Sequence, residues 1–285
     1  MPELVDWLRV LTTILADGSF ALAVGVLLAG AWGANGLRRF STVALAFLAG
    51  CYLVRPWFLA ESMSGSTGLR ETLGLVPDVL SSTRQGALWY AGGVVIVILL
   101  VAHVAWPSRP AIQLVALSAL AATKAASTHA SEAGDWSVAE LAEFLHLAAT
   151  AVWAGAILVS AWFVVPLLTR CEGPDALWKY GRRLSRTVTY ALLALAASGL
   201  YVSWSDMHSE IGRLWTTGWG KILLVKLFLV GIAALLGSMV RFRCLRRPAN
   251  SDRARLMEQL LCAEATALAL VLCLSGALAN ANPGL

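Results

Sequence analysis

The chain has 285 residues, of which 58% are hydrophobic and only 14% are Asp, Glu, Lys or Arg, a composition that excludes an ordinary soluble domain. Its formal charge of +5 comes from basic residues between apolar stretches, which is typical of a topology signal and does not indicate a nucleic-acid surface. The composition therefore predicts an integral membrane protein in contact with lipid.

Eight apolar stretches of membrane-spanning length follow one another along the chain. About 20 helical residues cross a hydrocarbon core of ~30 Å, and the stretches come close to or exceed this length. We therefore predict an all-α, polytopic membrane protein, a bundle of eight transmembrane helices that forms one domain over residues 1–285. The stretches are 7–31, 40–60, 84–106, 111–129, 136–165, 181–204, 218–240 and 257–278.

Two features of the first part of the chain predict how the bundle assembles. Gly18, Ala21 and Gly25 recur at helical spacing, and such small residues allow close approach of a neighbouring helix. The long connection at 61–84 contains GLRETLGLVPDVLSSTR, whose pattern predicts a short amphipathic helix on the membrane surface or over the end of the bundle.

The distribution of Lys and Arg predicts the orientation, because basic residues near helix ends stay in the cytoplasm. The even-numbered connections contain only Arg70, Arg84 and Arg213. We therefore expect both termini on the outer side, which is the periplasm for a bacterial inner membrane. The odd-numbered connections contain Arg38, Arg39, Arg109, Arg170, Lys179, Arg182, Arg183, Arg241, Arg243, Arg246, Arg247, Arg253 and Arg255.

The fifth stretch carries ionisable side chains into the hydrocarbon region. Such groups cost several kcal/mol unless they face a protein interior, a water-filled cavity or a metal, so they indicate a functional site. Glu143, His146, Thr150 and Trp153 are spaced by three, four and three residues and share one helix face. A carboxylate and an imidazole at this spacing bind one metal or form a hydrogen bond that fixes the histidine tautomer, and the spacing permits both.

Other apolar stretches also contain charged residues, most of them in the outer half of the membrane. This concentration predicts either a pocket open to the outside or a set of buried ion pairs. Lys226 in particular needs a neutralising carboxylate, for which Asp17 and Glu143 are the candidates. The group comprises Asp17, Arg55, Lys124, His129, Glu143, His146 and Lys226, with Glu264 slightly further inward.

A candidate metal site combines donors from three parts of the chain. His129 ends the fourth stretch, and a short connection makes the fourth and fifth helices antiparallel neighbours. His146 lies roughly 15 Å deeper if its helix begins at Trp136, so the two histidines belong to one site or to successive stations on a path. Imidazole with carboxylate suits Cu(II), Zn or Ni, whereas Cu(I) prefers sulfur. The predicted ligands are His129, Glu143, His146, Met207 and His208.

Two motifs resemble the CopD family of copper-resistance inner-membrane proteins. STHASEAGDWSVAELAEFLHLAATAVWAGAILV is similar to the family's central signature, in which a helix-ending histidine, a short acidic loop and a second histidine precede VWxG. TTGWGKILLVKLFLVGIAALLG is similar to the family's T-x-G-G-[RK]-x-L-L-x-K-L segment, and RPW at 55–57 also looks like this family. Together the motifs extend from about residue 50 to about residue 240.

The resemblance implies a multi-pass protein of the bacterial inner membrane that moves or hands over copper ions from the periplasmic side. His129 and His146 occupy the positions of the family's histidines. The resemblance also implies a periplasmic copper carrier of the CopC type as partner, here a separate chain because this sequence contains no β-rich domain. We expect no enzymatic activity.

Three other functions remain open. A b-type haem protein needs two imidazoles at one depth on opposite faces of the macrocycle, and the offset between His129 and His146 argues against it. A diiron carboxylate enzyme needs two ExxH helices, and only the Glu143–His146 pair lies at membrane depth. A purely structural subunit would show no metal dependence.

Overall fold

The computed structural model describes residues 2–34, 36–65, 68–128, 134, 136–206, 212–246 and 250–281. In these ranges the chain forms α-helices and two short π-helical segments, and no strands. The elements are α1 (Pro2–Ala31), α2 (Arg38–Ser64), α3 (Leu69–Ser82), α4 (Arg84–Ala105), α5 (Pro110–Ala125), α6 (Val138–Val159), η2 (Ser160–Val164), α7 (Val165–Cys171), α8 (Pro174–Asp206), α9 (Arg213–Thr216), α10 (Gly218–Met239), η3 (Val240–Cys244) and α11 (Ser251–Ala279).

The predicted all-helical membrane class is confirmed. Within the described ranges, seven helices are long and apolar enough to cross a membrane. The predicted stretch at 111–129 corresponds to α5, an apolar helix of 16 residues that is shorter than the usual spanning length. The protein is therefore a multi-pass membrane protein, with α5 as a short apolar helix in the same bundle.

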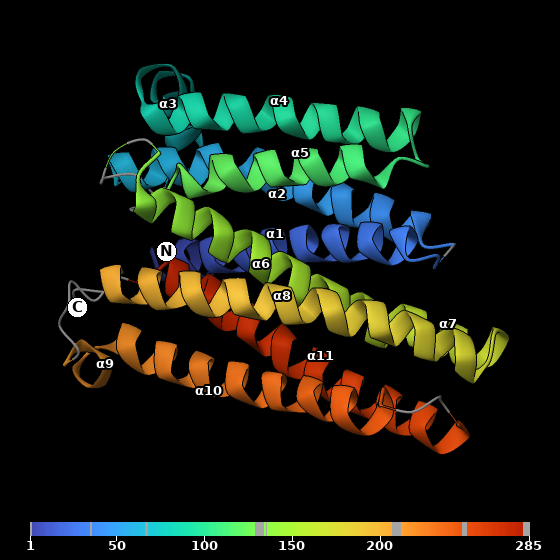
Figure 1. Ribbon diagram of the computed structural model, residues 1–285. Coiled ribbons are helices and arrows are strands. Elements are labelled where there is room, and N and C mark those ends of the chain that lie inside the picture. The colour runs from blue at the N-terminus through green and yellow to red at the C-terminus, as the bar shows by residue number, and fades with distance from the viewer. Residues whose placement is uncertain are drawn as a thin grey trace.

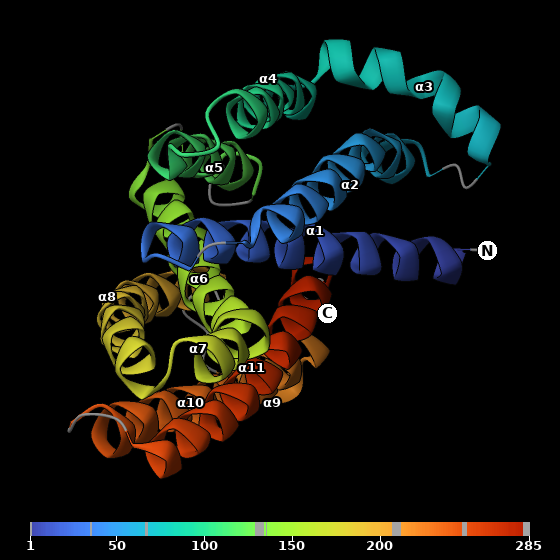
Figure 2. The same ribbon diagram turned by 90° about the vertical axis from the view of Figure 1, so that its right-hand side faces the viewer.

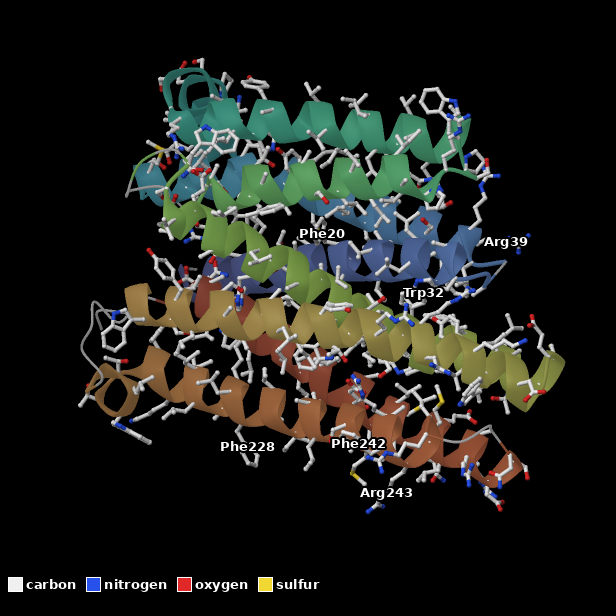
Figure 3. All side chains as sticks on the ribbon, viewed as in Figure 1. Phe20, Trp32, Arg39, Phe228, Phe242 and Arg243 are labelled. Carbon is white, nitrogen blue, oxygen red and sulfur yellow. The ribbon has the colours of Figure 1, made fainter. Side chains whose placement is uncertain are left out.

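The long helices run roughly side by side, and both ends of the chain lie at one end of the bundle together with α3 and α9 (Figure 1). Viewed along the bundle, α1 and α6 lie between a layer of α2, α4 and α5 and a layer of α8, α10 and α11 (Figure 2). Arg39 and Arg243 lie toward the opposite end from the termini, and Phe228 and Phe242 point outward from the lower edge (Figure 3). The amphipathic helix predicted at 61–84 is present as α3.

Helix α6 occupies the centre of the bundle: the span Val138–Cys171, which α6 begins, is mostly buried, whereas the span Gly218–Cys244, which α10 begins, is mostly exposed. Helices α1 and α6 pack with their backbones in contact. A Cβ atom on Gly25 would overlap the backbone of Gly155, and one on Gly155 would overlap the carbonyl oxygen of Ala21. The small-residue face predicted for the first helix is thus correct at Ala21 and Gly25, whereas Gly18 faces open space.

Candidate metal centre

The start of α6 determines the depth of the histidine. The Ser137 side chain caps the helix by accepting a hydrogen bond from the backbone N–H of Glu140 at 3.2 Å. Trp136 lies outside the helix with a left-handed φ of 62°, and its backbone N–H donates a hydrogen bond to the Glu140 carboxylate at 2.7 Å. The helix therefore begins at Val138, two residues later than predicted. His146 lies about 12 Å along the helix axis from Val138, somewhat shallower than the sequence predicts.

The imidazole ring of His146 lies against Gly199 of α8. A Cβ atom on Gly199 would be 3.0 Å from Cε1 and 3.1 Å from Nδ1 of the imidazole, so only glycine lets the helix come this close without displacing the ring. The Nδ1 atom is buried and has no hydrogen-bond partner among the described residues. Because a buried polar atom normally has a partner, this nitrogen is suited to bind a metal ion.

A cationic side chain also lies near the imidazole. Lys226 of α10 is close enough for its charge to act on the His146 ring. An ammonium group repels a bound cation and so weakens the binding of a metal at this position. Glu143, one turn before His146, and Lys226 each have a polar or electrostatic partner.

Two charged residues of α1, Arg9 and Asp17, form interhelical ion pairs. Arg9 pairs with Glu61 of α2, and Asp17 pairs with Lys124 of α5. Of the two carboxylates predicted as partners of Lys226, Asp17 thus binds Lys124, and the pairing of Lys226 with Asp17 or Glu143 stays a prediction. Of the charges predicted for the outer half, Asp17 and Lys124 thus form an ion pair, as one of the two predicted arrangements requires.

The polar face of α6 continues into the core of the bundle. Trp153 is 1% exposed, and its indole N–H donates a hydrogen bond to Oε1 of Glu264 on α11 at 3.2 Å. Glu264 is also 1% exposed. One face of α6 thus carries Glu143, His146 and Trp153, and at its inner end it contacts the buried carboxyl group of Glu264.

Only part of the predicted ligand set lies in the described residues. Glu143 and His146 are close on α6, whereas His129, Met207 and His208 lie outside the described ranges. Within those ranges there is no group of three or more His, Cys, Asp or Glu side chains that converge as a metal site. The five-residue ligand set therefore stays a prediction, and His146 is the member whose geometry fits a metal ligand.

His103 has a different environment, in which both ring nitrogens have partners. It is 7% exposed, its Nδ1 lies 3.1 Å from Oε1 of Gln113, and its Nε2 lies 2.9 Å from Oγ1 of Thr42. Both ring nitrogens have partners, so His103 connects α4 with α5 and α2 and has no nitrogen left for a metal.

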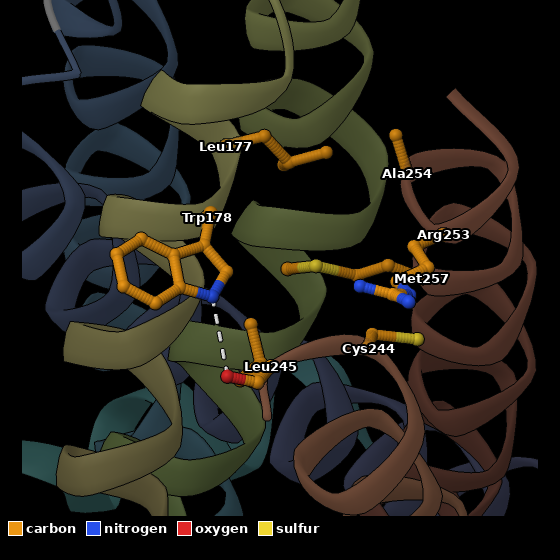
Figure 4. Close-up of a pocket in the computed structure, with 7 residues that line it drawn as sticks. All are labelled: Leu177, Trp178, Cys244, Leu245, Arg253, Ala254 and Met257. Carbon is orange, nitrogen blue, oxygen red and sulfur yellow. Dashed lines mark hydrogen bonds between the residues drawn. The ribbon is translucent and has the colours of Figure 1, made fainter. Parts of the chain in front are cut away.

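A hollow between α8, η3 and α11 contains two sulfur atoms but does not form a copper site (Figure 4). The Met257 thioether points toward α8, while the Cys244 thiol points away from it. The guanidinium group of Arg253 lies beside them, and Trp178 donates a hydrogen bond to the carbonyl of Leu245 at 3.2 Å. Soft donors suited to Cu(I) are present, but they do not converge on one point.

Two contacts of this region are not predicted from the sequence as parts of a site. Gly199 has no motif around it, because its importance comes from the imidazole of another helix. The contact between Trp153 and Glu264 joins positions 111 residues apart. The only sequence signal for this contact is that a Trp on the polar face of the fifth stretch and a Glu in the eighth fall at similar depth.

Comparisons with known proteins confirm the resemblance to the CopD family. Residues 178–278, from α8 to α11, match the family described as Copper resistance protein D. This segment contains the TTGWGK motif but not the STHASEAG motif. Copper transport protein CutJ of Bacillus subtilis (strain 168) is 26% identical over 237 residues, which are 78% of this chain and 42% of CutJ. The chain thus spans less than half the length of that relative. No solved structure matches the chain.

Proposed function

We propose that this protein moves or hands over copper ions from the periplasmic side of the bacterial inner membrane. The single observation that carries this proposal is the buried Nδ1 of His146, which has no hydrogen-bond partner among the residues that the structure describes and lies on a helix that also carries Glu143. The match of residues 178–278 to Copper resistance protein D and the similarity to a copper transport protein favour copper over other transition metals.

In this proposal the ion binds transiently. Imidazole and carboxylate donors suit Cu(II), and Lys226 near His146 weakens the binding of a cation. Weak binding favours transport, since an ion has to leave each station as well as enter it. His129, Met207 and His208 serve as outer ligands that deliver copper to Glu143 and His146.

The proposed topology has eight crossings, with α5 as the short one and both termini in the periplasm. It is supported by the position of both chain ends at one end of the bundle, with Arg39 and Arg243 toward the other (Figures 1 and 3). The protein has no enzymatic activity in this proposal, and its partner is a separate periplasmic carrier of the CopC type. The whole chain acts as a single domain.

The test is the metal content of the purified protein after exposure to Cu, Zn or Ni. We expect the wild type to bind copper at equilibrium with free ions, and His146→Ala to bind much less. The matched control is His103→Ala, which removes a histidine whose ring nitrogens are both hydrogen-bonded. Equal copper in all three proteins would contradict the site, and a haem Soret band in the wild type would favour the haem-binding alternative.

A further inference from the structure

A small, partly open cavity lies beside Glu264, away from the candidate metal centre. Its volume is about 20 Å³, and residues of α6, α8, α10, η3 and α11 line it. This volume is enough for one water molecule. Among the lining residues, Glu264 and Ser185 have polar side chains, and the others are aliphatic or glycine. The cavity therefore brings one carboxyl and one hydroxyl group together inside an apolar wall.

The Glu264 carboxyl group has only one of its oxygens bonded. Oε1 accepts the Trp153 hydrogen bond at 3.2 Å, whereas Oε2 is buried without a partner in the described part of the chain. Gly237 leaves space beside it, because a Cβ atom there would be 3.0 Å from Oε1 and 3.3 Å from Oε2. A charged carboxylate with one hydrogen bond is costly in such surroundings, which favour the neutral acid.

In the part of the chain that the structure describes, no hydrogen bond or ion pair joins Glu264 to an ionisable group of a neighbouring element. Among the described residues, the hydrogen bond to Glu264 comes from Trp153. Tyr180 of α8 shares a hydrogen bond with Ser160, and Arg182, Arg183 and Arg186 of the same helix are exposed. Arg241 of η3 donates to Thr189, and Asp17 of α1 pairs with Lys124. His146 of α6 and Lys226 of α10 lie toward the outer end, Arg170 and Cys171 lie at the end of α7, and Glu258 and Cys262 lie on α11 itself.

Two irregular helical segments flank the cavity. Val240, which lines it, begins η3, and Ile157, which also lines it, lies one turn before η2. π-Helical segments occur frequently at functional sites, because the extra residue in the turn rearranges backbone and side chains locally. The cavity thus lies where α6 and α10 both depart from regular helix.

We propose that Glu264 is a proton-exchange site inside the membrane and that its proton exchange is coupled to copper movement. In the exchange, the O–H bond of the Glu264 acid breaks and its proton passes to a water molecule in the cavity, which leaves a carboxylate; the return step reverses this. Copper approaching along the polar face of α6 favours the carboxylate, since positive charge stabilises the anion. His146 and Trp153 are about 10 Å apart along α6.

The proton site itself is tested by pH-difference infrared spectroscopy of the purified full chain. We expect the C=O band of a protonated carboxyl group in apolar surroundings in the wild type and its loss in Glu264→Gln. Glu258→Gln is the matched control, with the same substitution on the same helix. A wild type without this band, or a band unchanged in Glu264→Gln, overturns the proposal.

A second variant keeps the test decisive if Glu264→Gln does not fold. Trp153→Phe removes the hydrogen bond to Oε1 and retains an aromatic ring. We expect it to shift the carboxyl band, because the C=O frequency depends on hydrogen bonding to the carbonyl oxygen. A band at the wild-type position in Trp153→Phe contradicts the assignment to Glu264.

The coupling rests on the proposed copper function and is tested in vesicles that contain a pH-sensitive dye. We expect copper added outside the wild-type vesicles to cause proton movement in the opposite direction. In Glu264→Gln this movement falls to the level of protein-free vesicles, while copper binding by the protein persists. Wild-type proton movement in Glu264→Gln overturns the coupling. Wild-type vesicles that transport no copper contradict the copper function, and the infrared band then still decides the proton site.

Discussion

At the scale of single residues, the environment of His146 depends on a glycine in another helix. A Cβ atom at position 199 would be 3.0 Å from the imidazole, closer than ordinary van der Waals contact. The imidazole of His146 on α6 lies against the backbone of α8 at this position. The orientation of the imidazole is therefore set by α8 as well as by α6.

We expect Gly199→Ala to displace the His146 ring by a few tenths of an ångström and to weaken copper binding by roughly 10-fold, as changes beside a metal ligand commonly do. The measurement is a copper titration of the purified variant. Gly231→Ala is the matched control, since a Cβ atom at Gly231 meets no other atom within 4 Å. Unchanged affinity in Gly199→Ala would show that the position of the ring does not matter for the metal.

Lys226 provides a second residue-scale prediction. An ammonium group at membrane depth needs a carboxylate, and Asp17 already binds Lys124. We expect Lys226→Met to lower accumulation, because its removal leaves a buried carboxylate without a cation, which costs about 3–5 kcal/mol for a buried pair. The measurement is the amount of folded protein in the membrane.

The companion substitutions identify the carboxylate. We expect Lys226→Met with Glu143→Gln to restore accumulation and Lys226→Met with Asp17→Asn to lower it further, because the latter also breaks the Asp17–Lys124 pair. If Lys226→Met accumulates normally and only copper handling changes, the lysine belongs to the transport path and has no structural role as a buried ion-pair partner.

At the scale of helices, the crossing of α1 and α6 positions the polar face of α6. The two backbones touch where Gly25 faces Gly155, with Ala21 beside them. Helices in lipid associate through such close packing of small residues, since lipid supplies no hydrophobic force between apolar surfaces. A larger side chain at this crossing forces the helices apart.

We therefore expect Gly25→Val to lower the free energy of unfolding by at least the ~1–3 kcal/mol typical of overpacking. The control is Gly18→Val on the same helix, since a Cβ atom on Gly18 would have no neighbouring atom within 4 Å. Thermal stability in detergent compares the two variants with the wild type. Similar losses in both would indicate that valine in α1 matters by itself and that the crossing does not.

At the scale of the whole molecule, the bundle has two chemically different ends. The end with both termini, α3 and α9 has few basic residues in its connections, whereas Arg39 and Arg243 lie toward the opposite end (Figures 1 and 3). Retention of basic segments in the cytoplasm orients a multi-pass protein. The outer ends of α1, α6 and α10 then face the periplasm.

We expect a reporter fused after Leu285 to be active in the periplasm, and one inserted in the connection between α10 and α11 to be active in the cytoplasm. Paired phosphatase and fluorescent-protein fusions measure the two locations. A cytoplasmic C-terminal reporter would place His146 nearer the cytoplasmic side and would reverse the proposed direction of copper entry.

The sequence by itself determined the class of protein and the composition of each helix. Apolar stretches and helical spacing depend only on neighbouring residues, so they predict the all-helical membrane fold and the shared face of Glu143, His146 and Trp153. Helix caps are equally local, but Ser137 places the start of α6 later than hydropathy does.

Only the tertiary structure decided which residues of different helices meet. Asp17 binds Lys124, Gly199 faces His146, and Trp153 donates to Glu264. Charge and depth allow several such pairings, because any acid in the outer half matches any base at that level. The choice follows from which helices adjoin and how they are rotated, and this depends on side-chain packing over the whole bundle.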